Sequence, residues 1–445
     1  MFVRRLILSL VSSLLLSVSL GGSTAEQAEI RKIPVTKGIA SHPVNGGHCL
    51  ISDGEYQYIA FYDGDHRMTV GKRRLSETNW DFIKLPERVG WDTHNKIVLF
   101  QDRKGYLHIT GNMHCAPLRY YRTKAPADIR TFQAIHRWTG DYEDRVTYPS
   151  VLKLRDGSVY MLYRHGGSGN GMRILLGYDE ETQKWTKTVP ILTNGMGRTP
   201  TCNAYPIGLL EDRQGTWHIA WCWRETPDVI TNFDICYARS FDRGRTWKGW
   251  DGRELELPIT PENAHVVEHI EQDAGLMNGG SFAVDDQGRP YVGYTRFDKD
   301  GYNQLYIATP VDGKWRIIQL TDWKHRFYFQ GRGTIPQYPP VPRVSITKEQ
   351  NILVAYNNVY AEPRKGQFTL RTEQLPTIKP GQYSVQKFQG ADLTVPYVRA
   401  VNHGPLPPGV THYMQQQTDP PNRDRKPADA RAPTMIYVVE VKKKG

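Results

Sequence analysis

The sequence predicts an all-β fold, a seven-bladed β-propeller, because one strand motif repeats along the chain and helical periodicity is scarce. Each copy is a turn rich in Asp and Gly, followed by a strand of alternating apolar residues. The copies are SDGEYQYIAFYD from Ser52, DRKGYLHITGN from Asp102, RDGSVYMLYR from Arg155, DRQGTWHIAWCW from Asp212, DQGRPYVGYTRF from Asp286 and the weaker TKEQNILVAYNN from Thr347. Such repetition indicates a fold assembled from similar sheets.

A second strand pair built around an aromatic residue follows most copies, as in RILLGYDEETQKWTKTV and QLYIATPVDGKWRIIQL. Together the two halves make four antiparallel strands, which is one propeller blade. Six blades are visible. We expect the seventh to close the ring by pairing a strand near residues 30–35 with the C-terminal MIYVVEVKK, so that neither edge is left unpaired. One short helix is expected at residues 261–271.

The segment SFDRGRTW from Ser240 fits the S-x-D-x-G-x-T-W Asp-box of sialidase-like propellers. In this pattern Asp242 and Gly244 fold a hairpin while Trp247 packs between strands. We interpret it as a structural device that supports the fold and carries no chemistry.

The first residues combine two arginines, an apolar run and small residues, MFVRRLILSLVSSLLLSVSLGGSTA. This pattern predicts a signal peptide over residues 1–25 and a single propeller domain over 26–445, hence a secreted or periplasmic protein. The run is too short to predict a stable membrane span. The polar, Pro-rich stretch at about 414–433 is expected to be an exposed loop before the last strand.

The formal net charge of +11 is spread along the chain. On an exported protein such charge suits an acidic polysaccharide, and no nucleic-acid-binding motif is present. A basic surface that serves solubility alone is the alternative. We expect a monomer.

The five cysteines are odd in number and irregular in spacing, which is not a disulfide framework, although one or two bridges could form. Buried apolar positions are the expected role for them. Cys115, Cys202, Cys222 and Cys236 with nearby His could instead hold a structural zinc, and calcium could stiffen a loop. No ligand spacing identifies a metal site, and no cofactor is required.

Two histidines are the first candidates for chemistry. VGWDTHNKIVL places His94 at the entry to an aliphatic strand, and GNMHCAPLRYY places His114 after the next strand. Adjacent strands would bring both imidazoles to one end of a sheet, His94 flanked by Asp92 and Asn95 and His114 by Asn112. We expect Asn95 and Asn112 to bind substrate. Structural histidines with satisfied hydrogen bonds are the alternative interpretation.

Four further side chains complete a chemically coherent set. DRVTYPS supplies Tyr148, YRHGGSGNG supplies Arg164, CNAYPIG supplies Tyr205 and CWRETPD supplies Arg224. Imidazoles and a phenol can move protons, while guanidinium groups can neutralise a sugar carboxylate. Glycines after Arg164 are expected to turn the chain and leave room for a bulky ligand. Stacking and surface ion pairs are the alternative roles.

The residues leave two other possibilities open. An ordinary glycoside hydrolase needs paired carboxylates, and Asp63, Asp65, Asp92 and Asp144 form no evident pair. His48, in VNGGHCLI, is either a turn residue or a catalytic acid in another part of the molecule.

The run GWDTHN, GNMHC, DRVTYP, YRHGGSGNG, CNAYP and WCWRETPD resembles the BNR-repeat family of carbohydrate-active propellers, from about His42 to Gly333. That family includes ulvan lyases and an α-L-rhamnosidase that acts on rhamnose linked to glucuronic acid. Where the family often has NHD, this chain has NFD at residues 232–234, which puts a metal site there in doubt.

The resemblance to the lyases implies that His94 and His114 act at the scissile bond, with Tyr148 as the proton-transfer group. It further implies that Arg164 binds the uronate carboxylate and that Tyr205 lines the pocket. The reaction would be β-elimination at a rhamnose to uronic acid linkage. The resemblance to the rhamnosidase implies hydrolysis by His48 on the opposite face, and a non-catalytic glycan-binding propeller is the third hypothesis.

Overall fold

The structure is a computed structural model that describes residues 28–192, 202–334, 340–375, 385–387 and 397–443. Its regular elements are strands and three short 3-10 turns, which are η1 (Ile129–Thr131), η2 (Val229–Thr231) and η3 (Thr372–Gln374). The all-β prediction is therefore confirmed. The predicted signal peptide lies outside the described residues, and the described part has no helix long and apolar enough to cross a bilayer.

The chain divides into two compact units. The first contains residues 1–89, 389–419 and 429–445, and the second contains residues 90–388 and 420–428. The expectation of one domain over 26–445 stays a prediction.

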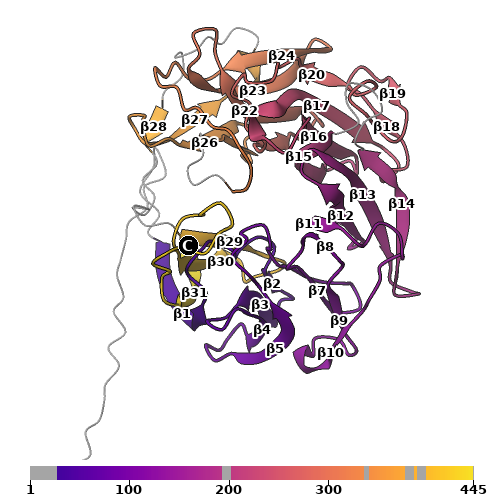
Figure 1. Ribbon diagram of the computed structural model, residues 1–445, viewed down its shortest axis with the longest axis vertical. Helices are drawn as coiled ribbons and strands as arrows, with labels where there is room; N and C mark the ends of the chain where they lie inside the picture. Colours follow the sequence, from indigo (N-terminus) through magenta and orange to yellow (C-terminus); the bar gives the residue numbers. More distant parts are fainter. Residues whose placement is uncertain (1–27, 193–201, 335–339, 376–384, 388–396, 444–445) are drawn as a thin grey trace, which may run out of the picture. The chain divides into compact units, whose positions relative to one another are not determined.

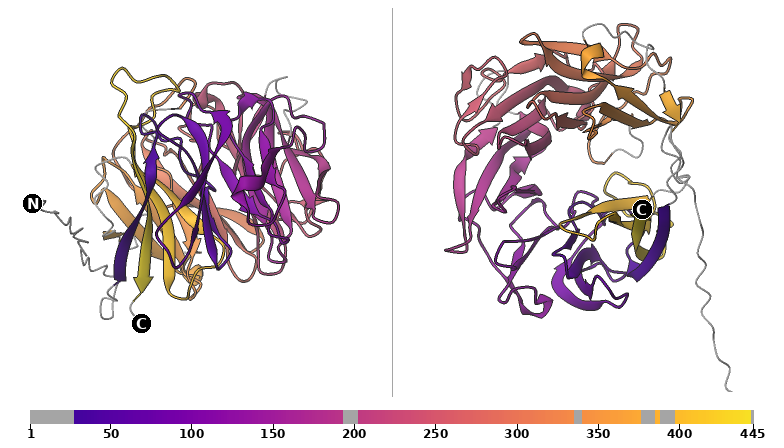
Figure 2. Two further views of the ribbon diagram at one scale, coloured as in Figure 1. Left: turned by 90° about the horizontal axis from the view of Figure 1, so that it is seen from below. Right: turned by 180° about the vertical axis from the view of Figure 1, so that it is seen from behind.

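The first unit is built from two antiparallel four-stranded meanders joined by the parallel pair β2 and β29. One meander runs in the order β1 (Ala28–Gly38), β31 (Thr434–Lys443), β30 (Val410–Gln417) and β29 (Tyr397–His403). The other runs β2 (Leu50–Ser52), β3 (Tyr56–Tyr62), β4 (Arg67–Arg74) and β5 (Asp81–Arg88). The expected pairing of the chain's terminal strands is confirmed, with Ile30 opposite Val441 (Figure 2).

The second unit contains five further sheets, which follow one another in sequence order (Figure 1). The first contains β6 (Val98–Gln101), β7 (Leu107–Thr110), β9 (Tyr120–Thr123) and β10 (Phe132–Ala134). The second contains β8 (His114–Ala116), β11 (Val146–Lys153), β12 (Val159–Gly167), β13 (Asn170–Asp179) and β14 (Lys184–Leu192). The third is β15 (Asn203–Glu211), β16 (Trp217–Arg224), β17 (Asn232–Ser240), β18 (Trp247–Lys248), β19 (Glu254–Leu255) with β20 (Val266–Glu268). The fourth contains β21 (Ser281–Val284), β22 (Pro290–Phe297), β23 (Asn303–Val311) and β24 (Lys314–Gln319). The fifth contains β25 (Arg343–Ile346), β26 (Ile352–Asn357), β27 (Lys365–Leu370) and β28 (Val385–Lys387).

At three junctions between these sheets the first strands contact each other: β6 contacts β11, β15 contacts β21, and β21 contacts β25. At the remaining junction β15 contacts β13. Such inner-strand contacts are what blades arranged about an axis make. The seven-bladed count and the closed ring nevertheless stay predictions.

A recurring aspartate explains why the repeated turns fold alike. In the turn after β6, Asp102 Oδ1 accepts from the N–H of Tyr106 at 2.9 Å, and Asp102 Oδ2 contacts His108 Nε2 at 3.3 Å. One carboxylate oxygen thus accepts from the backbone N–H four residues later, and the other contacts the side chain six residues later. The same arrangement occurs at Asp63, Asp212, Asp285 and Asp298. Each carboxylate thus closes a turn and fixes the next strand.

The Asp-box is confirmed as a turn device. Ser240 Oγ accepts from the N–H of Gly244 at 2.8 Å, and Asp242 accepts from the N–H of Thr246 at 2.9 Å. The fully buried Trp247 donates its indole N–H to Gly244 O at 3.1 Å. Gly244 has φ +82°, and a Cβ there would lie 2.8 Å from Leu175, so glycine is required at this position.

Two local predictions are wrong. Residues 261–271 contain turns and the strand β20, which pairs with β17, rather than a helix. This segment lies along a sheet edge, where hydrogen bonds to β17 replace those of a helix. The loop expected at 414–433 starts later, because Met414 to Gln417 belong to β30 between β29 and β31.

Candidate functional site

A tight turn before β6 presents His94. The backbone N–H of His94 donates to Asp92 Oδ1 at 2.8 Å, an Asx-type turn that fixes the main chain on both sides of the imidazole. The side chain of His94 is 19 % exposed, so the ring lies at the surface of the second unit without being fully solvated.

The carboxylate of Asp92 binds both predicted histidines. Its Oδ1 lies 2.6 Å from His94 Nδ1, and its Oδ2 lies 2.5 Å from His114 Nδ1. The two rings are stacked with centroids 4.2 Å apart. Burial would raise the pKa of Asp92, but the bonds from His114 and His94 outweigh it and hold that pKa well below its usual range. An ionised carboxylate only accepts, so both Nδ1 atoms carry protons and the basic lone pair of a neutral ring is on Nε2.

A bulge in β11 brings Tyr148 to the same place. The register of β11 on β12 shifts between Thr147 and Ser150, and Tyr148 has φ +53°, which is uncommon for a residue other than glycine. Its ring centroid lies 5.7 Å from that of His94 and 6.3 Å from that of His114. Burial raises the pKa of the Tyr148 phenol, so it stays protonated near neutral pH.

Two buried arginines lie against the ring of Tyr148. Arg164 and Arg173 are opposite one another in the β12 and β13 hairpin, and their guanidinium carbons are 5.0 and 5.8 Å from the ring centroid. They are 1 % and 3 % exposed. Arg164 donates to Thr147 Oγ1 at 3.2 Å and to Gly166 O at 3.1 Å, while its Nη1 has no hydrogen-bond partner among the described residues.

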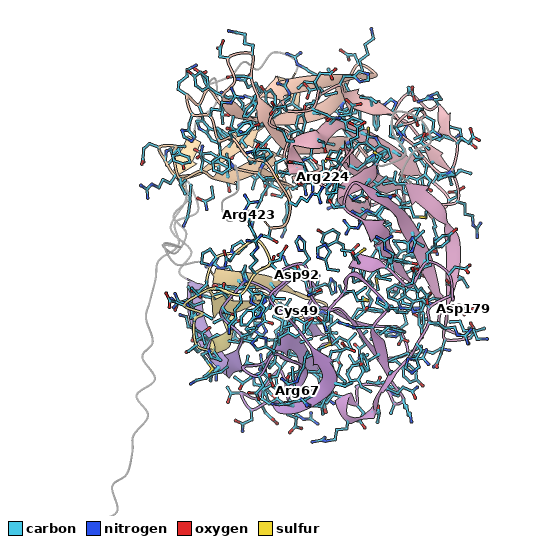
Figure 3. All side chains as sticks on the ribbon, in the orientation of Figure 1. Cys49, Arg67, Asp92, Asp179, Arg224 and Arg423 are labelled. Carbon is cyan, nitrogen blue, oxygen red and sulfur yellow. The ribbon has the colours of Figure 1, made fainter. Side chains whose placement is uncertain are left out.

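Tyr205 extends this group of side chains. Its hydroxyl lies 2.8 Å from Ser168 Oγ and accepts from Arg224 Nη1 at 3.3 Å. Burial would raise the pKa of Tyr205, but the charges of Arg224 and Arg164 outweigh it and lower the pKa below its usual value. Figure 3 labels Asp92 and Arg224, which mark the two ends of this run of side chains.

All three nitrogens of the Arg224 guanidinium donate hydrogen bonds to neighbouring side chains. It donates from Nε to Asn232 Oδ1 at 2.7 Å and from Nη2 to Asn278 Oδ1, in addition to the Tyr205 contact. Its carbon lies 4.3 Å from the Tyr205 ring centroid. Its direct effect is therefore on the Tyr205 phenol.

These arginines form a cluster of positive charge, comprising Arg164, Arg173 and Arg224. In the part of the chain that the structure describes, no carboxylate lies within ion-pair distance of any of the three. A buried guanidinium without a counterion is costly, and an anionic ligand would reduce that cost.

The remaining predicted residues take different positions. Asn95 follows His94 in the turn, where its N–H lies 3.4 Å from Asp92 O. Asn112 is buried with φ +60°, and its carbonyl accepts from Arg119 Nη1 at 2.5 Å. His48 belongs to the first unit, where its ring stacks on His403 with centroids 3.7 Å apart.

The glycine-rich hairpin between β12 and β13 turns as expected, and one of its glycines packs closely against another loop. The room expected there for a ligand stays a prediction. Gly169 has φ +69°, and a Cβ on it would lie 2.3 Å from the backbone carbonyl carbon of Thr226. The glycine permits close packing against the loop after β16. That packing holds Ser168 beside Tyr205.

Three site residues escaped the sequence reasoning. Arg173 could have been found, because a hairpin turning at the glycines places it opposite Arg164. Thr334 and Asp424, which contact His94, lie more than 200 residues away from it, and nothing local to either one marks it.

Among the described residues, Asp92, His94 and His114 are the one group whose ligand atoms lie close enough to hold a metal ion. Their hydrogen bonds through Nδ1 already account for this closeness. The cysteines are free thiols. Cys202 and Cys236 are buried in one hydrophobic cluster, and Cys222 is buried in a neighbouring one. Phe233 of the NFD run is buried in the cluster that contains Cys202 and Cys236.

Comparison with known proteins identifies relatives of the chain. A family model described as a BNR repeat-containing family member matches residues 56–323. The chain is 24 % identical to Ulvan Lyase-PL25 of Pseudoalteromonas sp. (strain PLSV) over 356 residues, covering 68 % of this chain and 65 % of that protein. It is 24 % identical to an ulvan lyase of Nonlabens ulvanivorans over 314 residues, covering 57 % of this chain and 60 % of that protein. The chain thus matches less than two thirds of the length of these relatives.

Solved structures share the fold. The crystal structure of polysaccharide lyase Uly1 matches 96 % of this chain and 100 % of its own, with a TM-score of 0.67 at 14 % identity. A PL25 ulvan lyase bound to -[GlcA(1-4)Rha3S]- matches 91 % of this chain and 95 % of its own, with a TM-score of 0.63 at 15 % identity. At these identities the likeness concerns the fold alone.

Proposed function

The chain belongs to the BNR repeat-containing family, and from this membership and the geometry of the site we propose that it is a polysaccharide lyase. It cleaves a rhamnose to uronic acid linkage in an ulvan-like acidic glycan by β-elimination. The observation that carries the proposal is the carboxylate of Asp92, which binds the Nδ1 atoms of His94 and His114 beside Tyr148. The ulvan lyases among its relatives support the substrate class.

The base in this proposal is His114. Its Nδ1 proton is bound by Asp92, and its Nε2 has no hydrogen-bond partner in the described part of the chain. A neutral imidazole held in this tautomer can take the proton from carbon 5 of the uronic acid. The side chain is 29 % exposed, which gives a sugar ring access to it.

Tyr148 is the acid. As the electron pair of the broken C–H bond forms the C4=C5 double bond, the bond from C4 to the glycosidic oxygen breaks, and that oxygen requires a proton. A phenol whose pKa is raised by burial is protonated and can supply it. The products are an unsaturated uronate and a free hydroxyl on the departing sugar.

The arginine cluster supplies the positive charge. Removing a proton next to a carboxylate places negative charge on the carboxylate oxygens, and guanidinium groups stabilise it. Arg164, with an unpartnered Nη1, is proposed to act on the carboxylate, while Arg224 acts through Tyr205.

The fold and setting complete the proposal. The sheets form one seven-bladed propeller, which is supported by the inner-strand contacts of the second unit and by the pairing of β1 with β31. The protein is exported, acts as a monomer and has an acidic polysaccharide as its partner.

The test is incubation with ulvan while absorbance in the ultraviolet band of a conjugated uronate is followed. We expect the absorbance to rise with the wild-type protein. With His114→Ala or Tyr148→Phe the rate of this rise should be at least about 100-fold lower. The variant His48→Ala tests the alternative in which the protein is a hydrolase that depends on His48. If sugar is released with a flat absorbance trace, and His48→Ala abolishes that release, the lyase proposal is wrong.

A further inference from the structure

We infer that Asp424, in the Pro-rich segment between β30 and β31, is a positioning residue that holds His94 in place. The inference rests on the proposed function for its kinetic consequence. The segment, expected from sequence to be an exposed loop, instead inserts one carboxylate among the residues around His94. Arg423, which precedes Asp424, is labelled in Figure 3.

The contacts of Asp424 converge on the His94 turn. Its Oδ2 lies 3.4 Å from His94 Nδ1, and its Oδ1 accepts from the hydroxyl of Thr93 at 3.2 Å and from the N–H of Thr93 at 3.4 Å. Thr334 adds a hydroxyl donor to Oδ1 at 2.7 Å and an N–H donor to Oδ2 at 3.2 Å. One carboxylate therefore fixes the residue before His94 and approaches the ring itself.

Thr334 connects the same groups a second time. Its hydroxyl lies 2.6 Å from the hydroxyl of Thr93 and 3.5 Å from His94 Nε2. Thr93 and Thr334 are both buried, so their hydroxyls depend on this carboxylate for hydrogen bonds. Removing the negative charge would leave more donors than acceptors around His94.

The backbone of the segment is shaped for this contact. Arg423 and Asp424 have φ +45° and +60°, two successive left-handed residues that are not glycine. Arg423 Nη1 donates to Arg332 O at 3.2 Å, which ties the segment to the chain just before Thr334. The side chain of Asp424 is only 16 % exposed, unlike its basic neighbours.

The kinetic test compares Asp424→Asn with Asp429→Asn, which removes the same charge from an exposed position in the same segment. On ulvan we expect Asp424→Asn to lower kcat by about 10-fold with KM changed by less than about 2-fold. Substrate binding is kept, but His94 no longer stacks correctly against the proposed base His114. Its thermal midpoint should stay within about 3 °C of wild type, and Asp429→Asn should match wild type in all three quantities.

A spectroscopic test does not depend on turnover. With ¹⁵N-labelled histidine, the His94 ring resonances, assigned by their loss in His94→Gln, should shift in Asp424→Asn and stay in place in Asp429→Asn. Unmoved resonances overturn the inference whether or not ulvan is cleaved. An unchanged kcat, or a loss of kcat that merely follows a large fall in thermal midpoint, also overturns it, whereas a wild-type protein that gives no ultraviolet product counts against the proposed function alone.

Discussion

At the scale of single residues, Asp92 is the side chain on which the two imidazoles depend. An amide at this position would offer one oxygen to two Nδ1–H groups, so one histidine would have to change tautomer or lose its partner. We expect Asp92→Asn to lower kcat at least about 100-fold. Asp144→Asn, which alters an exposed carboxylate 3.0 Å from His165, is the matched control and should leave ulvan cleavage unchanged.

The site residues differ in how well the sequence could predict them. His94, His114 and Tyr148 follow recognisable turns and strands, and the structure brings their rings within 7 Å of one another. The role of Asp92 as a bridge was missed, because whether an aspartate closes a turn or binds a side chain depends on which residues approach it. The role of Asp424 was missed because it contacts His94, which is far from it in the sequence.

At the scale of the strand elements, the recurring turn aspartates bind buried histidines in two copies. His108 and His218 lie between a carboxylate and a phenol, with Nδ1 2.6 and 2.7 Å from Tyr120 and Tyr237 hydroxyls. Both rings are almost fully buried. Burial lowers the pKa of His108 and of His218, and the hydrogen bonds that these rings donate to Asp102 and Asp212 only partly oppose this.

A folded-state pKa below the unfolded value means that protons bind the unfolded chain more readily. The contribution of these two neutral rings to the free energy of unfolding is therefore fully present above about pH 6.5. It is lost progressively as the pH falls below that value. We expect the thermal midpoint of the wild type to fall from pH 7 to pH 5, and less steeply in His218→Gln, since Gln304 fills the same position beside Asp298 in another copy. His136→Gln, at an exposed position, should keep the wild-type slope.

The strand elements were well predicted where their hydrogen bonds are local. The turns at Asp102, Asp212 and Ser240 close within a few residues, so sequence alone specifies them. The bulge at Tyr148 was not foreseen, because it arises from the register of β11 on β12. The strand β20 was mistaken for a helix for the same reason, since its pairing partner lies in β17.

At the scale of the whole molecule, β31 lies between β1 and β30, so it holds the first and last described strands in one sheet. Val438 is fully buried and pairs with Ile33 and Met414. We expect Val438→Asp to lower the thermal midpoint by more than about 10 °C, because it buries an unpaired charge. Limited proteolysis should then cut within residues 28–38. The exposed Lys442→Asp, in the same strand, should change neither measurement.

The pairing of β1 with β31 also sets an order of events in biosynthesis. The strand at residues 28–38 leaves the ribosome first among the described elements, yet its hydrogen-bonding neighbour is made last. Until β31 has been translated, the edge of β1 has to be kept from pairing with other chains. A protein assembled in this way is suited to a route in which the nascent polypeptide stays extended until β31 has been made.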